Sequence, residues 1–187
     1  MKLETAQNYA AEIITATKPF VQHDLISIAG SIRRRRPEVG DIEILAVPKQ
    51  GSISAFWSAI IYMNSATHDN WKPDTKVTAQ SRYVRLTRNT EHGVLQLDVF
   101  LPHAFDWGRM LAIRTGPADY SARLASAWVR KGYRGTDAGL LPESDCIRKG
   151  EKWVVKPNTE PRPVRFETEA SFYDWLRIPW VSPEKRF

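Results

Sequence analysis

The chain has 187 residues, of which 42% are hydrophobic, enough to form the core of one large domain or of two small ones. Its formal net charge of +6 and isoelectric point near 9.5 favour a polyanionic partner, with nucleic acid ahead of an anionic membrane surface. The single cysteine excludes an internal disulfide, and the lack of a signal segment or of about 20 consecutive apolar residues predicts a cytoplasmic protein with no membrane span.

The first quarter of the chain predicts a helix followed by two strands. Apolar residues recur at helical spacing over residues 3–17, which indicates an amphipathic helix that ends near Pro19. Short apolar runs predict strands at 25–29 and 41–47, and Pro48 stops the second strand. The turn between these strands carries the most distinctive motif of the chain.

The next region predicts one more helix and a set of strands. Apolar residues return to helical spacing at 52–63, with Ser52 as a candidate N-cap. Residues 64–74 are polar and typical of a loop. Three strands are expected after this loop, at 76–78, 82–87 and 94–101. A hairpin at 89–93 would join the last two, so the expected fold class is α+β with a mostly antiparallel sheet and flanking helices.

Two acidic residues alternate in the second strand. Asp41 and Glu43 are separated by one residue, so both project from the same face of the strand and repel each other. A hard, oxygen-seeking divalent cation such as magnesium is the usual means of holding such a pair together. Taken alone, however, Asp-x-Glu is a common pattern that is more often solvated or paired with a basic side chain.

A third acidic residue, Asp98, lies in the strongly apolar strand at 94–101. An unpaired charge in such a strand would be costly, so Asp98 needs a partner. The partner is either an arginine among Arg82, Arg85 and Arg88 or a cation shared with the first two acids. We favour the metal site, because an adjacent strand would bring Asp98 to the same cluster.

The turn after the first strand reads Gly30-Ser31 and leads into four arginines at 33–36. Gly-Ser at this point can open a helical turn whose N–H groups and hydroxyl receive phosphate oxygens. A phosphate-binding turn beside a metal-binding pair suggests nucleotide chemistry. Arg35 and Arg36 are equally consistent with a solvated basic loop.

These motifs together resemble the signature of polymerase-beta-type nucleotidyltransferases, in which Gly-Ser leads through a basic turn to Asp-x-Asp. The segment WGRMLAIRTG at 107–116, a helix at 117–131 and the closing segment 169–187 are similar to family X DNA polymerases. The likeness is strongest to the shortest, virus-encoded members, which have no N-terminal lyase domain. It implies a nucleotidyltransferase palm at 1–104 and a small C-terminal α/β subdomain at 105–187 that binds nucleotide and DNA.

The resemblance implies a template-directed DNA polymerase that adds dNMP to a primer 3′-hydroxyl with two Mg²⁺ or Mn²⁺ ions in short-gap repair. The expected partners of this monomer are dNTP and gapped or nicked DNA, a DNA ligase is left open as a further partner, and a viral or bacterial origin is expected. The residues implied for metal binding and catalysis are Asp41, Glu43 and Asp98. Those implied for nucleotide binding are Gly30, Ser31, Arg34, Gly40, Thr115 and Gly116.

Four cations of the C-terminal subdomain are candidates for contacts with the DNA backbone, and they are equally consistent with ordinary surface charge. They are Arg123, Arg130, Lys131 and Arg134.

The chain departs from the family pattern in the second acid and in the nucleotide contacts. Glu43 replaces an aspartate, and its extra methylene is expected to loosen magnesium geometry and to favour manganese. Ile113 and Arg114 stand where the family usually has aromatic residues. Two other classes stay open: a template-independent or small-substrate nucleotidyltransferase, and a catalytically inactive nucleic-acid-binding module.

Overall fold

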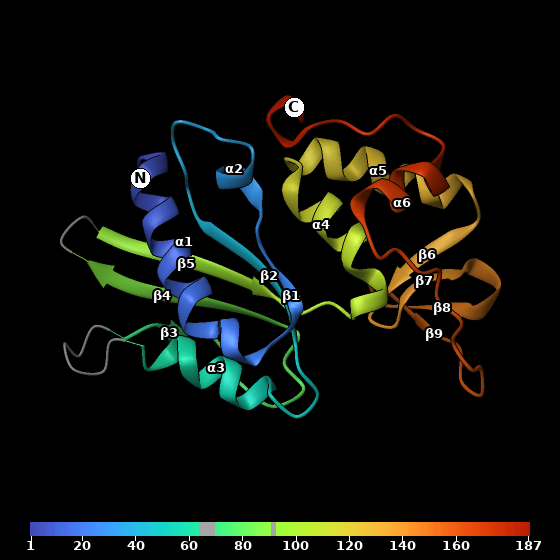
Figure 1. Ribbon diagram of the computed structural model, residues 1–187. Coiled ribbons are helices and arrows are strands. Elements are labelled where there is room, and N and C mark those ends of the chain that lie inside the picture. Colours follow the sequence, from blue (N-terminus) through green and yellow to red (C-terminus); the bar gives the residue numbers. More distant parts are fainter. Residues whose placement is uncertain (64–69, 91–92) are drawn as a thin grey trace. The chain divides into compact units, whose positions relative to one another are not determined.

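The computed structural model describes residues 1–63, 70–90 and 93–187 (Figure 1). The chain groups into two compact units. The first unit contains Met1–Pro102 and Ser182–Arg186, and the second contains His103–Val181 and Phe187. The sequence interpretation assigned residues 182–186 to the second domain, whereas in the structure they group with the first unit.

The first unit contains a five-stranded sheet in the described residues, with the strand order β1-β2-β5-β4-β3. The strands are β1 (Val21–Ile28), β2 (Ile42–Pro48), β3 (Lys72–Pro73), β4 (Tyr83–Thr90) and β5 (Gly93–Phe100). All neighbouring strands pair antiparallel except β2 and β5, which run parallel. The protein is therefore α+β with a mostly antiparallel sheet, as the sequence predicts.

One face of this sheet forms the core of the first unit. Alternate residues of β2 and β5, among them Ile44 and Val99, are fully buried there. They pack with α1 (Leu3–Thr17) and α3 (Ile53–Ile61), which lie on the same face of the sheet (Figure 1). Burial of such side chains stabilises the fold by about 1.5–3 kcal/mol each, and a shift of register by one residue would expose them. The intervening residues of β2 and β5 therefore project from the opposite face.

The predicted elements of the first unit agree with the structure in most cases. Helix α1 has the predicted bounds, and the turn after β1 forms a short helix, α2 (Gly30–Arg33). Strand β1 begins at Val21, four residues earlier than predicted, and its register with β2 is irregular between Val21 and Ile26. Ser52 occupies the N-cap position of α3, but its side chain makes no capping hydrogen bond.

The predicted strand at 76–78 is wrong. Thr78 instead belongs to a turn, in which its backbone N–H donates to Ser81 Oγ at 3.0 Å and its Oγ1 accepts from Gln80 N at 3.2 Å. These local side-chain hydrogen bonds compete with a sheet ladder. Residues 64–69 of the predicted loop and 91–92 of the predicted hairpin lie outside the described residues.

The second unit combines helices with two small antiparallel sheets. Its helices are α4 (Trp107–Thr115), α5 (Ala118–Arg130) and α6 (Glu169–Leu176). Its strands pair as β6 (Tyr133–Thr136) with β7 (Gly139–Pro142), and as β8 (Cys146–Lys149) with β9 (Lys152–Val155). The aromatic residues Trp128, Phe166 and Phe172 lie in its core, and Thr168 begins α6 with a capping box.

Single-turn 3-10 helices occur at Lys18–Phe20, Ala104–Asp106, Glu143–Asp145 and Pro183–Lys185. Among the described residues, no helix is both long enough and apolar enough to cross a membrane.

Candidate functional site

The register of β2 and β5 brings the predicted acids to one face of the sheet. Glu43 and Asp98 are paired positions of these two parallel strands, and Asp41 lies two residues before Glu43. Asp41 is half-buried, and burial together with the charge of Asp98 raises the pKa of its carboxyl above the ordinary value. The ionised forms of Asp41 and Asp98 therefore repel each other, and Gln96 Nε2 donates to Asp41 Oδ2 at 3.5 Å.

Asp98 is held by two side chains of the neighbouring strand β4. Arg85 Nε donates to Oδ1 at 2.8 Å and Arg85 Nη2 donates to Oδ2 at 3.0 Å, while the Tyr83 hydroxyl donates to Oδ1 at 3.1 Å. Hydrogen bonding to Asp98 and its charge raise the pKa of Arg85, whereas burial and then the charge of Asp98 raise the pKa of Tyr83. The ion pair that the sequence left open for Asp98 is thus formed with Arg85.

The Gly30 turn packs directly against Glu43. The Ala29 N–H donates to the Glu43 carbonyl oxygen at 2.8 Å, and Gly30 adopts a left-handed φ of 58°. A β-carbon at Gly30 would lie 1.7 Å from Glu43 Oε2, so a side chain at this position would collide with the carboxylate. The left-handed backbone angle favours glycine here, and any side chain at this position would have to displace the carboxylate end of Glu43.

Ser31 and Arg34 follow Gly30 in the same turn. The hydroxyl oxygen of Ser31 is buried and has no hydrogen-bond partner within the part of the chain that the structure describes. Burial lowers the pKa of Arg34, and the charge of Glu43 opposes this effect. The turn therefore holds a buried hydroxyl and a cation beside the acids, and both groups are suited to anionic oxygens.

The other predicted nucleotide-binding residues lie in different surroundings. Gly40 precedes Asp41 and has no atom within 4 Å of the place where its β-carbon would lie. Thr115 is fully buried at the end of α4, and its hydroxyl donates to the Leu111 carbonyl oxygen at 2.6 Å. At Gly116 a β-carbon would lie 2.6 Å from Tyr120 Cδ1, so the missing side chain makes room for Tyr120.

The four predicted DNA-binding cations differ in their contacts within the protein and in their exposure to solvent. Arg123 donates to the Phe187 carbonyl oxygen at 2.6 Å, and Lys131 Nζ lies 5.2 Å from the centre of the Trp175 ring. Arg134 pairs with Glu143 at 2.7 Å and has a side chain only 14% exposed, whereas Arg130 is exposed. Arg134 is thus the least accessible of the four to a phosphate backbone.

The donor chemistry of the three acids fits a hard divalent cation, because only carboxylate oxygens are offered and the repulsion between Asp41 and Asp98 is what a cation relieves. Within residues 1–63, 70–90 and 93–187, no three His, Cys, Asp or Glu side chains meet as a metal-binding group. In this arrangement both oxygens of Asp98 accept hydrogen bonds from Arg85. The two-metal site stays a prediction.

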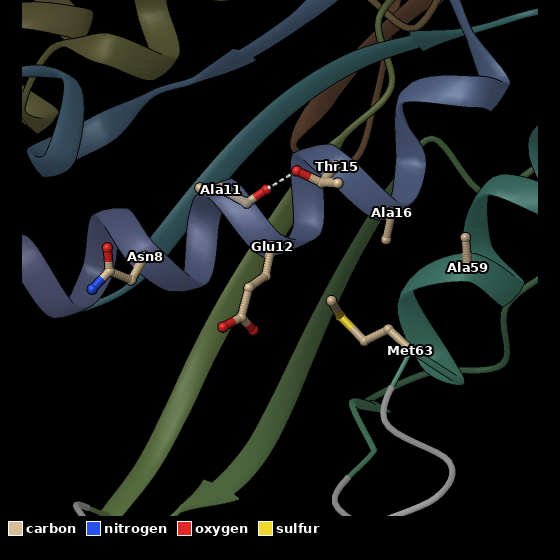
Figure 2. A pocket seen from close by; sticks show the side chains of 7 residues that line it. All are labelled: Asn8, Ala11, Glu12, Thr15, Ala16, Ala59 and Met63. Carbon is tan, nitrogen blue, oxygen red and sulfur yellow. Dashed lines mark hydrogen bonds between the residues drawn. The ribbon is translucent and has the colours of Figure 1, made fainter.

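A separate groove lies between α1 and α3. Glu12 of α1 and Met63, two residues after the end of α3, line this groove, and Thr15 Oγ1 donates to the Ala11 carbonyl oxygen at 2.8 Å (Figure 2). None of the predicted site residues lines this groove.

Sequence reasoning missed the roles of Tyr83 and Arg186. Tyr83 alternates with buried Val84, which could have placed it on the same face as Arg85 and hence near Asp98. Arg186 is fully buried in the first unit, and its carbonyl oxygen accepts a hydrogen bond from Arg36 Nη2 at 3.3 Å. Since the two residues are far apart in the sequence, no local pattern could have indicated this proximity.

No protein-family model matches this chain, and no curated protein sequence matches it significantly.

Proposed function

We propose that the protein is a template-directed DNA polymerase whose first unit is a nucleotidyltransferase palm. The observation that carries this proposal is the arrangement of the acids: Glu43 and Asp98 are paired across parallel strands, and Asp41 is electrostatically coupled to Asp98. The Gly30 turn packs against Glu43, which supports binding of a triphosphate next to the acids.

In this proposal the primer 3′-hydroxyl passes its proton to Asp98, its oxygen forms a bond to the α-phosphorus of a dNTP, the bond to the β-phosphate breaks and pyrophosphate leaves. Asp41, Glu43 and Asp98 would hold Mg²⁺ or Mn²⁺, which when bound would acidify the primer hydroxyl and neutralise charge on the phosphates. Ser31 and Arg34 would bind phosphate oxygens, and Arg34 would offer a planar, permanently charged fork. The chain's own contribution is mainly positioning and electrostatics, without a covalent intermediate.

The decisive experiment is primer extension on gapped, open-template and single-stranded DNA, each with and without magnesium or manganese. The wild type should extend a templated primer only when a divalent metal is present. Asp41→Ala and Asp98→Ala should each abolish extension, and DNA binding should persist. Substantial extension by either variant would refute the assignment of the acids, and extension on single strands alone would favour a template-independent transferase.

A second candidate is a catalytically inactive nucleic-acid-binding module. The bidentate pairing of Asp98 with Arg85 favours it, because this acid already has a basic partner. This candidate predicts salt-sensitive DNA binding with no extension in any metal. Mobility-shift binding measured beside the extension assay separates the two candidates.

A further inference from the structure

Arg85 lies directly opposite Asp98 in the sheet of the first unit. The two residues are paired positions of the antiparallel strands β4 and β5, so their side chains project from the same face. Asp98 is in turn the paired position of Glu43 on the parallel strand β2. The face that carries the acids therefore also carries a guanidinium group.

Arg85 binds Asp98 with the geometry in which a guanidinium group holds a carboxylate most strongly. Its Nε and Nη2 donate in parallel, one to each oxygen of Asp98, at 2.8 and 3.0 Å. The Tyr83 hydroxyl donates to one of these oxygens at 3.1 Å, and the Tyr83 ring stacks on Phe100 with the ring centres 4.9 Å apart. Both oxygens of Asp98 are thus engaged by donors from β4.

The two partners of this ion pair differ in their freedom to move. The Asp98 side chain is 7% exposed, so its ionised form needs a positive partner. The Arg85 side chain is 42% exposed and has a long flexible stem, so its guanidinium group can turn into water. A divalent cation and a guanidinium group at the same carboxylate would repel each other, which favours exchange of one for the other over joint binding.

We infer that Arg85 is a built-in competitor of the divalent cation for Asp98 and thereby determines how tightly the three acids bind metal. This inference rests on the metal binding in the proposed function. Asp98 exchanges one positive partner for another, and only the half-exposed side chain of Arg85 has to move. Arg85 accordingly stabilises the acids in the metal-free protein, and the same contact lowers their affinity for Mg²⁺ or Mn²⁺.

The test measures Mn²⁺ binding in the absence of nucleotide and DNA, with free Mn²⁺ followed by electron paramagnetic resonance. Arg85→Met keeps an unbranched side chain and removes the guanidinium group, so it should lower the Mn²⁺ Kd by about tenfold or more, the scale of hydrogen bonds to a charged group. Arg85→Lys keeps the charge but loses the fork, and it should lower the Kd by a smaller factor. The control Arg82→Met removes an exposed arginine just before β4 and should stay within about twofold of wild type.

A double variant ties the effect to Asp98. Arg85→Met/Asp98→Asn should bind Mn²⁺ no more tightly than Asp98→Asn, because the gain from Arg85→Met requires the carboxylate that it releases. In the presence of a chelator the unfolding temperature of Arg85→Met should lie below that of wild type, since Asp98 is left buried without its charged partner. Mn²⁺ should raise the unfolding temperature of this variant by more than it raises that of wild type.

An Mn²⁺ affinity of Arg85→Met equal to or weaker than that of wild type would overturn the inference, and a weaker one would show that Arg85 instead orients Asp98 for the metal. If Arg85→Met does not fold, Tyr83→Phe takes its place, because it removes one donor to Asp98 and leaves Arg85 in position. Wild-type Mn²⁺ affinity in both Tyr83→Phe and Arg85→Lys would then overturn the inference. A wild type whose Mn²⁺ affinity depends on Arg85 as expected, but that extends no primer, would refute the polymerase proposal and leave this inference standing.

Discussion

The α-carbon of Gly30 lies directly against the carboxylate of Glu43, and a β-carbon added there would come within 1.7 Å of Oε2. The turn that would receive phosphate and the strand that carries two of the acids are thus in contact at a single pair of residues. A substitution at either residue should therefore change the packing of the other.

Gly30→Ala should destabilise the protein more than Gly51→Ala. Both glycines have positive φ, but nothing lies within 4 Å of a β-carbon at Gly51, so that variant carries only the backbone cost of about 1–2 kcal/mol. The double variant Gly30→Ala/Glu43→Ala should recover the excess, because it removes the collision. Urea unfolding measures the three free energies, and equal costs for the two single variants would show that Glu43 does not constrain this position.

Asp41→Asn should stabilise the protein at neutral pH in the presence of a chelator. Burial and the charge of Asp98 raise the pKa of Asp41 above its ordinary value of 3.8. The Asp41 carboxyl therefore binds its proton more tightly in the folded state than in the unfolded state. The ionised carboxyl therefore destabilises the fold, and its cost grows as pH rises from 3.8 through the raised pKa. The difference in unfolding temperature between variant and wild type should shrink as pH falls towards 3.8.

The control for this pH experiment is Glu38→Gln, which removes an exposed acid from the same unit. Its unfolding temperature should follow that of the wild type across the pH range. If Asp41→Asn also followed the wild type, the proposed repulsion between Asp41 and Asp98 would be absent.

Glu43→Asp should shift the metal preference of nucleotide addition from manganese towards magnesium. Magnesium requires near-octahedral coordination at about 2.0–2.1 Å, and the longer glutamate is harder to fix in such a geometry. The wild type should accordingly be faster with manganese. Initial extension rates for both proteins in each metal decide the matter, and an unchanged or lowered magnesium-to-manganese ratio in the variant would refute the prediction.

Asp106→Ala should destabilise the protein by about 3–5 kcal/mol, because it leaves a buried arginine charge unpaired. Arg109 Nε donates to Asp106 Oδ1 at 2.7 Å, and the side chains of the pair are 6% and 5% exposed for Arg109 and Asp106. The double variant Asp106→Leu/Arg109→Met should cost much less, since it removes both charges together. Thermal unfolding of the two variants checks this, and equal losses would mean that the charges do not interact.

The placement of the three acids could be predicted because it follows from alternation along two strands. Apolar residues such as Ile44 and Val99 mark the core face, which leaves Glu43 and Asp98 on the other face once the strands are adjacent. The predicted bounds of α1 succeeded for a similar reason, since its apolar stripe is long and regular.

The partner of Asp98 could not be chosen from the sequence. Three arginines were available in and beside β4, and the choice depends on the hairpin register, which pairs Arg85 with Asp98. The wrong strand at 76–78 had a similar cause, because three residues carry too little pattern to outweigh the hydrogen bonds around Thr78.

The first unit includes Ser182–Arg186, which the ribosome makes only after His103–Val181 of the second unit. The first unit therefore cannot finish folding when its own residues up to Pro102 have been synthesised. The sheet and the arginine turn at 33–36 are synthesised early. Arg36 and Arg35 can contact Arg186 and Glu184 only after all of His103–Val181 has been synthesised. At about 5–20 residues per second this delay lasts several seconds, during which the nascent first unit has its core strands but an unanchored arginine turn. A fragment that ends at Pro102 would remain permanently in that state.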